Sequence, residues 1–274
     1  MNTNNSSSAG QKRRTSAFLP LHTSLFFIRE AKHLLSKRDA LFRLCICSVF
    51  SVFCISFGIL LTIASIFFYR SSGFPTLTEK ANGILFTVFT ACIWFCVLFF
   101  CYVLKNVQTY LALQIEKNDE KPFFRHFVTS SNIKKCFFEY LSFLISNIII
   151  CPFLILAYAV YKANAKINVE TMVICGILIL TYLYLLCIIK GVYIFLPHVQ
   201  NEENTFKRIK CAVSLLCGNV CRFIFLNLRL LPYVIISAVS FGILHVFYTS
   251  PLISSSYASF ISFVYDVQKY KNNF

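Results

Sequence analysis

The chain has 274 residues, of which 57% are apolar and 14% charged, and its mean hydropathy is +0.68. Soluble domains carry about 25% charged residues, so this composition excludes an ordinary soluble protein and predicts a polytopic membrane protein. The formal net charge of +15 would suit a nucleic-acid partner if the basic residues were clustered for that purpose. Their distribution along the chain therefore decides the interpretation.

Six apolar stretches are candidates for membrane-spanning helices, because a helix needs about 20 apolar residues to cross the hydrocarbon core. The sequence therefore predicts an all-α fold with one membrane domain over residues 20–268. Residues 1–19 form a polar, basic tail that we expect to be disordered, and residues 269–274 form a short cytoplasmic tail. The predicted spans are about 44–69, 83–104, 137–161, 171–196, 220–244 and 251–265.

The basic residues favour one side of these spans. With the N-terminus inside, the cytoplasmic segments hold twenty of the 26 Lys and Arg, and the outer loops hold four. Such a bias over short loops is the positive-inside signal, so we expect both termini to be cytoplasmic. The basic excess then reflects topology and attraction to anionic lipid, and we expect no nucleic-acid partner.

Three basic segments precede pairs of spans: 25–41, 123–135 and the stretch that begins at Asn204. Each combines an apolar stripe with basic residues elsewhere, as in a helix that lies in the plane of the lipid headgroups. The apolar stripe of the third contains Phe206, Ile209, Ala212, Val213, Leu215 and Leu216, and Lys207, Arg208 and Lys210 are expected on the other side. Gly218 and Asn219 are predicted to end this helix, since both tolerate the left-handed conformation.

These segments supply the candidate lipid-binding residues. A basic residue near an anionic surface contributes about 1 kcal/mol, so anionic headgroups are the expected partner, with other membrane proteins or further copies of the chain as a second class. The three segments are similar either because one unit was duplicated or because every inner loop must be basic. The sequence favours neither explanation, so both stay open. The candidate headgroup-binding residues are Lys207, Arg208, Lys210, Arg222, Arg29 and Lys32.

Three ionisable residues fall within predicted spans: Glu139, Lys190 and Arg229. Charged residues at such positions are the default functional candidates in a membrane protein. Lys190 and Arg229 lie about 10 Å from the inner ends of their spans, at 1.5 Å per residue, so both can reach the headgroups. A buried acid needs a partner, and we expect the Glu139 carboxylate to pair with Lys190 or Arg229.

No residue set specifies a reaction. The five histidines are scattered, and the thirteen cysteines include two pairs at helical spacing, Cys92 with Cys96 and Cys217 with Cys221, without further ligands nearby. We expect these cysteines to be small buried hydrophobes. The sequence therefore predicts a protein that is not an enzyme, with no cofactor and no metal.

Several residues resemble motifs of the bacterial integral membrane proteins grouped as domain of unknown function 975. Arg29-Glu30-Ala31 and the following residues resemble the opening helix of that family, and Tyr193 to Glu203 resembles the stretch after its fourth span. The best match is Ala212 to Leu228, and Leu252 departs from the family pattern where a Tyr is usual. The resemblance implies six spans and a bacterial inner-membrane location, and it implies no activity. The matched positions are Ser214, Gly218, Asn219, Arg222, Phe223 and Leu226, followed by Pro251 and Tyr257-Ala258-Ser259-Phe260.

Two functions remain open at this point. The first is a non-enzymatic membrane protein that holds anionic lipid or organises other membrane components. The alternative is a small transporter or channel, which would need a polar path across the bilayer. A lipid-modifying enzyme would need acids, bases or metal ligands at the inner interface, and only His198 with Glu202 and Glu203 could supply them.

Overall fold

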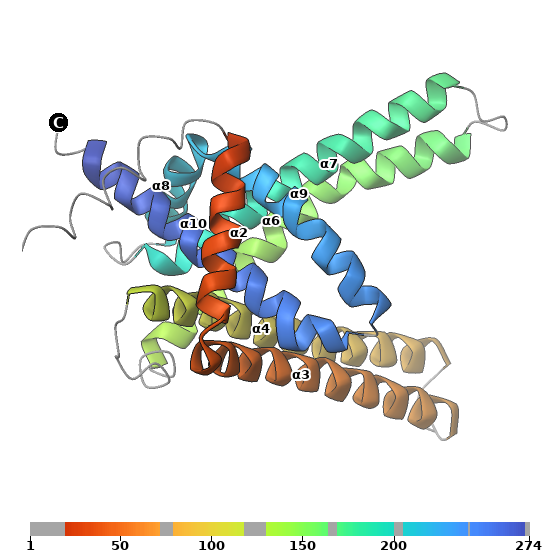
Figure 1. Cartoon of the computed structure of the whole chain (residues 1–274). Coiled ribbons are helices and arrows are strands. Elements are labelled where there is room, and N and C mark those ends of the chain that lie inside the picture. Colours follow the sequence, from red (N-terminus) through yellow and green to blue (C-terminus); the bar gives the residue numbers. More distant parts are fainter. Residues whose placement is uncertain are drawn as a thin grey trace, which may run out of the picture. The chain divides into compact units, whose positions relative to one another are not determined.

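The computed structural model describes residues 20–71, 79–117, 130–163, 169–199, 205–240 and 242–271 (Figure 1). Within these ranges the regular structure is entirely helical, which confirms the all-α class. The predicted tail, residues 1–19, and most of the second basic segment lie outside them. The helices are α2 Pro20–Leu35, α3 Arg38–Ser71, α4 Glu79–Lys117, α6 Ser130–Ala163, α7 Val169–Phe195, the 3-10 turn η1 Leu196–His198, α8 Thr205–Cys217, α9 Val220–Val239, the π-helical turn η2 His245–Thr249 and α10 Ser250–Lys271.

Five of the described helices are long and apolar enough to cross a membrane: α3, α4, α6, α7 and α9. They correspond to the first five predicted spans, the fifth of which ends at Val239 and not at 244, and the chain is accordingly a polytopic membrane protein. The sixth predicted span, 251–265, lies in α10, which is not among these five helices. The physical reason is that α10 carries serines along its buried side, at positions 250, 254, 255, 256 and 259.

The chain packs as two compact units. One contains Ala31–Phe123 and Tyr233–Ala258, and the other contains Met1–Glu30, Phe124–Pro232 and Ser259–Phe274. Helices α2, α9 and α10 each contribute to both units. We call them the α3–α4 unit and the α6–α7 unit after their hairpins, and the single membrane domain over 20–268 stays a prediction.

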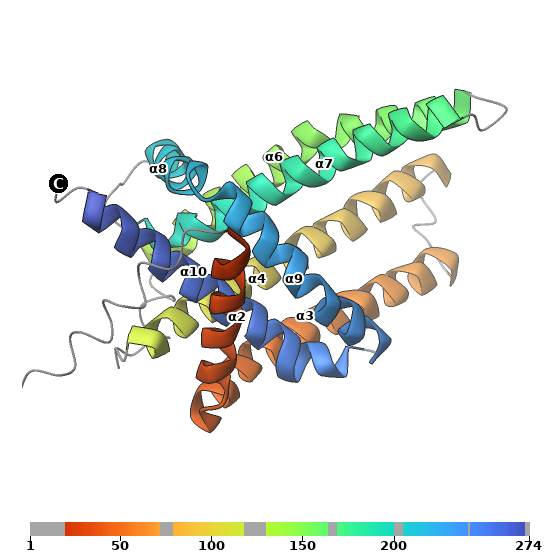
Figure 2. The same cartoon turned by 45° about the horizontal axis from the view of Figure 1, so that its top comes forward.

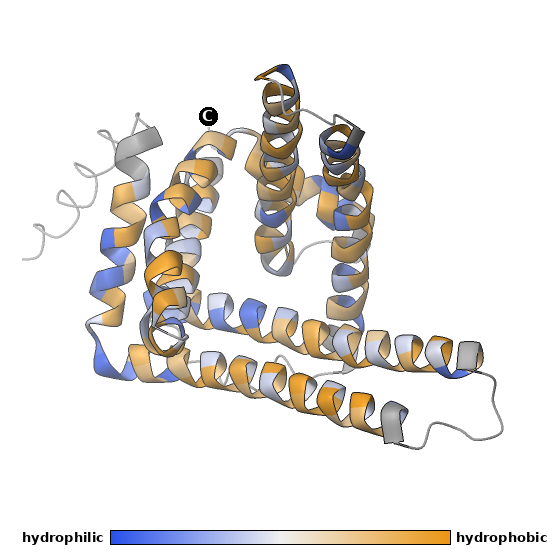
Figure 3. Ribbon diagram, turned by 90° about the vertical axis from the view of Figure 1, so that its right-hand side faces the viewer, coloured by the Kyte–Doolittle hydropathy of each residue, from blue (hydrophilic) through white to orange (hydrophobic). Residues whose placement is uncertain are grey.

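The α3–α4 unit is built on an antiparallel hairpin of two largely hydrophobic helices (Figure 3). The two helices pack closely at Gly58, where a Cβ atom would lie 2.8 Å from the side-chain atom Val97 Cγ2. Helix α4 continues past its predicted inner end at Leu104 to Lys117. This extension buries Val107 and Leu111, so it packs against protein rather than forming a loop.

The α6–α7 unit contains a second antiparallel hairpin, in which α6 and α7 run side by side (Figures 1 and 2). Its core is aromatic: the ring of Phe260 lies 5.4 Å from that of Phe27 and 5.6 Å from those of Phe195 and Phe223. These four rings come from α10, α2, α7 and α9. The most apolar stretch of α7 has none of its residues buried, as expected of a helix face that contacts lipid.

Candidate functional site

The most strongly organised charges of the α6–α7 unit are Arg208 and Glu139. Arg208 Nη1 lies 2.6 Å from Glu139 Oε1, and the two residues are 6% and 1% exposed. The same guanidinium donates from Nε to the Val199 carbonyl at 3.1 Å and from Nη2 to the Leu196 carbonyl at 2.8 Å. Arg208 therefore joins α8 to the start of α6 and to the end of α7. A cation at the C-terminal end of α7 also complements the helix dipole.

This pairing rotates α8 relative to the prediction. The buried face contains Arg208, Ala212, Leu215 and Leu216, which recur at helical spacing. Phe206 is 76% exposed and Val213 is also exposed, so this part of the apolar stripe faces away from the protein. The prediction was wrong for Arg208, which it placed with Lys207 and Lys210 on the polar side, because the buried Glu139 carboxylate holds this one cation inside the fold.

Glu139 consequently has a different partner from the two that the sequence suggested. The intramembrane pairing with Lys190 or Arg229 was wrong, because Arg208 on α8 supplies the positive charge. Lys190 is exposed, and its Nζ donates to Asn227 Oδ1 on α9 at 3.2 Å. Arg229 is partly exposed. Sequence reasoning missed Arg208 because it searched only the spans for a counter-ion.

The turn between α8 and α9 lies at Gly218 and Asn219, as predicted. Its conformation differs from the prediction, because Gly218 does not have the positive φ of the left-handed conformation. Among the described glycines, the positive φ is that of Gly242, at 80°. The Asn219 side chain forms the turn instead: Nδ2 donates to the Leu215 carbonyl at 3.2 Å and Oδ1 accepts from Arg222 Nη1 at 2.8 Å. The Arg222 guanidinium also lies 5.3 Å from the Phe263 ring centroid. Arg222, a candidate for headgroup binding, thus also makes contacts that stabilise the fold.

The remaining headgroup candidates lie at the surface, where Lys32 Nζ also lies 5.4 Å from the Tyr233 ring centroid. Lys207, Lys210, Arg29 and Lys32 have exposed side chains. Arg208 is the exception, because a guanidinium bonded to a carboxylate and two carbonyls inside the fold cannot also bind a headgroup. The exposed part of α8 therefore presents two cations, Lys207 and Lys210, beside the apolar ring of Phe206.

Next to this site, burial raises the pKa of Tyr265 on α10 to about 12. Its hydroxyl is buried and has no hydrogen-bond partner in the described part of the chain, so the neutral phenol is the form that the fold accommodates. Among the residues that the structure describes, no three His, Cys, Asp or Glu side chains gather in a group that could hold a metal ion.

The α3–α4 unit has a polar cluster of its own. Gln108 Oε1 accepts from Ser250 Oγ at 3.0 Å and from Ser254 Oγ at 2.9 Å. Its Nε2 donates to the Leu44 carbonyl and to Ser48 Oγ, both at 2.8 Å. The cluster is buried and its central amide is fully used, which indicates a role in holding α3, α4 and α10 together.

Comparison with family models, curated proteins and solved structures finds no match for this chain. The resemblance to the domain-of-unknown-function family is therefore an expectation from the sequence alone.

Proposed function

We propose that this chain is a non-enzymatic multi-pass protein of a bacterial inner membrane that holds anionic lipid through exposed basic residues on α8 and α2. We infer the bacterial inner membrane from the sequence resemblance. We infer the cytoplasmic placement of both termini from the charge bias. One structural observation carries the lipid proposal: the exposed part of α8 combines Lys207 and Lys210 with a Phe206 ring that is 76% exposed.

That combination suits the boundary between headgroups and acyl chains. An apolar ring inserts below the headgroups while lysines beside it attract phosphates. In water, a ring exposed to this degree next to two lysines would gain no free energy of apolar burial. Arg208 supports the proposal from inside the fold, because its bonds to Glu139 and to the end of α7 hold α8 beside two candidate spans.

The alternative, a transporter or channel, needs polar groups that face a path across the bilayer. Five hydroxyl side chains of the described spans instead donate to carbonyls of their own helices, one turn earlier. Such bonds satisfy a hydroxyl in an apolar helix without a water-filled path. These bonds within one helix are Ser51 to Cys47, Thr62 to Gly58, Ser65 to Leu61, Thr87 to Gly83 and Thr181 to Ile177.

A lipid-modifying enzyme would need the carboxylates of Glu202 and Glu203, and both residues lie outside the described residues.

The test measures lipid selectivity of the full chain in nanodiscs. With spin-labelled lipids, the association constant of phosphatidylglycerol relative to phosphatidylcholine is compared between the wild type, Lys207→Gln, Lys210→Gln and the double variant. At about 1 kcal/mol per charge, each single change should lower the selectivity about fivefold at low salt. The effect should shrink as salt rises.

Lys162→Gln is the matched control, because Lys162 is an exposed cation at the far end of α6. It should leave the selectivity of the inner-leaflet lipid unchanged. Equal selectivity in the wild type and the double variant would contradict the proposal, and so would an equal loss in the control.

A further inference from the structure

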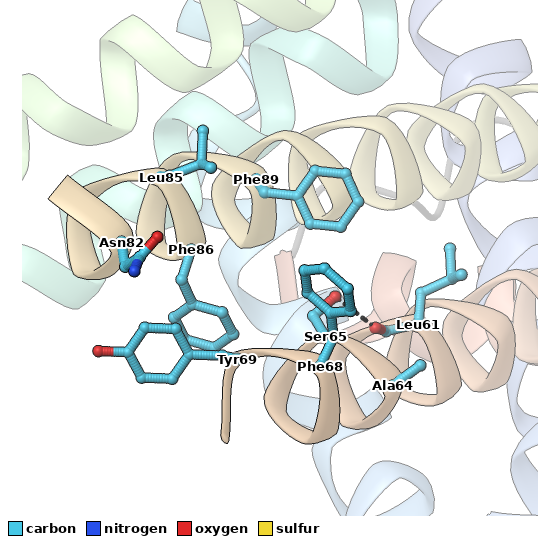
Figure 4. A pocket seen from close by; sticks show the side chains of 9 residues that line it. All are labelled: Leu61, Ala64, Ser65, Phe68, Tyr69, Asn82, Leu85, Phe86 and Phe89. Atoms are coloured by element: carbon cyan, nitrogen blue, oxygen red, sulfur yellow. Dashed lines mark hydrogen bonds between the residues drawn. The ribbon is translucent and has the colours of Figure 1, made fainter. Parts of the chain in front are cut away.

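The α3–α4 hairpin contains an open apolar groove with a volume of about 540 Å³ near its outer turn (Figure 4). One wall is formed by Leu61, Ala64 and Phe68 on α3, and the other includes Leu85 and Phe89 on α4. The volume falls within the range of about 300–1,000 Å³ that is usual for ligand sites. Phe68 and Phe89 are exposed, so the groove opens toward whatever surrounds the hairpin.

The groove has a polar end. Tyr69 and Asn82 lie together at one end, and Leu61 and Phe89 lie toward the other (Figure 4). The Tyr69 ring is held there by the Phe86 ring, with 5.1 Å between their centroids. This polar end coincides with the ends of two candidate spans, because the α3 span ends at Tyr69 and the α4 span begins at Ala81.

The length of the groove fits one leaflet. From Tyr69 to Leu61 the α3 wall rises through eight residues, which is about 12 Å at 1.5 Å per residue. Half of a hydrocarbon core is about 15 Å. A transmembrane helix from another chain would need a contact surface along the whole bilayer, whereas a single acyl chain needs one leaflet. Closer to the middle of the hairpin, the close approach of Gly58 and Val97 leaves no room between the helices.

We propose that this groove binds one acyl chain of a membrane phospholipid, with its ester and headgroup region at Tyr69 and Asn82. The site is independent of the α8 surface, since it lies in the other unit and depends on apolar contact instead of charge. The aromatic rings of Phe68 and Phe89 supply flat apolar walls against which a methylene chain packs.

The experiment uses the full chain, washed in detergent and then supplied with a limiting amount of a neutral phosphatidylcholine that carries a diazirine in its acyl chain. After irradiation, the adducts are mapped by mass spectrometry. We expect adducts in both walls, within 61–69 and 82–89. Ala64→Trp fills the groove and should lower this labelling several-fold. Phe67→Trp is the matched control, because Phe67 is 69% exposed and does not line the groove.

Labelling spread evenly over other exposed apolar positions, or unchanged labelling in Ala64→Trp, would overturn the proposal. The wild-type adduct map does not depend on how well any variant folds. The occupant is checked with p-benzoylphenylalanine in place of Phe68: capture of a lipid supports the site, and capture of a second chain overturns it. Because the probe is neutral, the Lys207→Gln and Lys210→Gln double variant should label normally, so this proposal and the α8 proposal fail separately.

Discussion

Replacing Arg208 by Met should be the most damaging single change in the α6–α7 unit. The substitution keeps an apolar stem of similar length but leaves the Glu139 carboxylate, 1% exposed, without its cation. It also removes the donors to the carbonyls of Leu196 and Val199. Removing one partner of a buried pair costs about 3–5 kcal/mol, which is a large part of the stability of most domains.

Glu139→Gln should cost less than Arg208→Met, about 1–3 kcal/mol. The Gln oxygen can still accept from Arg208 Nη1, and the two bonds from the guanidinium to carbonyls remain. In the double variant, Arg208→Met with Glu139→Met, neither charge is left unpaired. Its cost should therefore be smaller than the sum of the single costs.

The assay is unfolding in mixed micelles of mild detergent and dodecyl sulfate, followed by circular dichroism. Alkylation of Cys136, a buried thiol one turn before Glu139, reports local opening when its modified peptide is quantified by mass spectrometry. Lys207→Met is the control, because Lys207 is exposed on the same helix and should change stability by less than about 0.5 kcal/mol. Unfolding of Arg208→Met at the same dodecyl sulfate fraction as this control would contradict the prediction.

Three further predictions concern packing, pH and topology. Gly191→Val should destabilise by about 1–3 kcal/mol, because a Cβ there would lie 2.8 Å from a Leu216 methyl, whereas Gly176→Val, with nothing within 4 Å, should be neutral in the same unfolding assay. Because the pKa of Tyr265 rises to about 12 in the fold against about 10 in the unfolded chain, its contribution is present below pH 10 and lost as pH rises toward 12. Tyr265→Phe should thus lose less stability than the wild type between pH 9 and 11, and an equal loss would count against this. Cysteines introduced at positions 72 and 164 should react with an impermeant maleimide from outside, and protection of both would contradict the predicted orientation.

The sequence predicts the helices well because their cause is local. Long apolar runs form helices in a bilayer wherever they occur, so five candidate spans follow from hydropathy alone. The same local view fails for α10. Its serines are satisfied or covered by residues far away in sequence, such as Gln108, which bonds Ser254 across 146 positions. No hydropathy window contains that information.

The candidate site was only partly predictable for the same reason. The sequence indicates that Glu139 needs a cation, because a buried carboxylate cannot stay unpaired. The choice of Arg208 over Lys207 or Lys210 depends on the rotation of α8. That rotation is set by the carbonyls at the end of α7 and by close packing at Gly191, where Leu216 and Phe223 meet the helix backbone.

The most direct test of the account is the depth of the exposed side of α8 in a bilayer. Trp94 is the one native tryptophan, so Phe206→Trp in a Trp94→Phe background places a single fluorophore beside Lys207. In bilayers with lipids brominated at defined acyl positions, the account predicts strongest quenching by bromines nearest the headgroups. Equal fluorescence with and without brominated lipids, or strongest quenching by bromines at the bilayer centre, would contradict it.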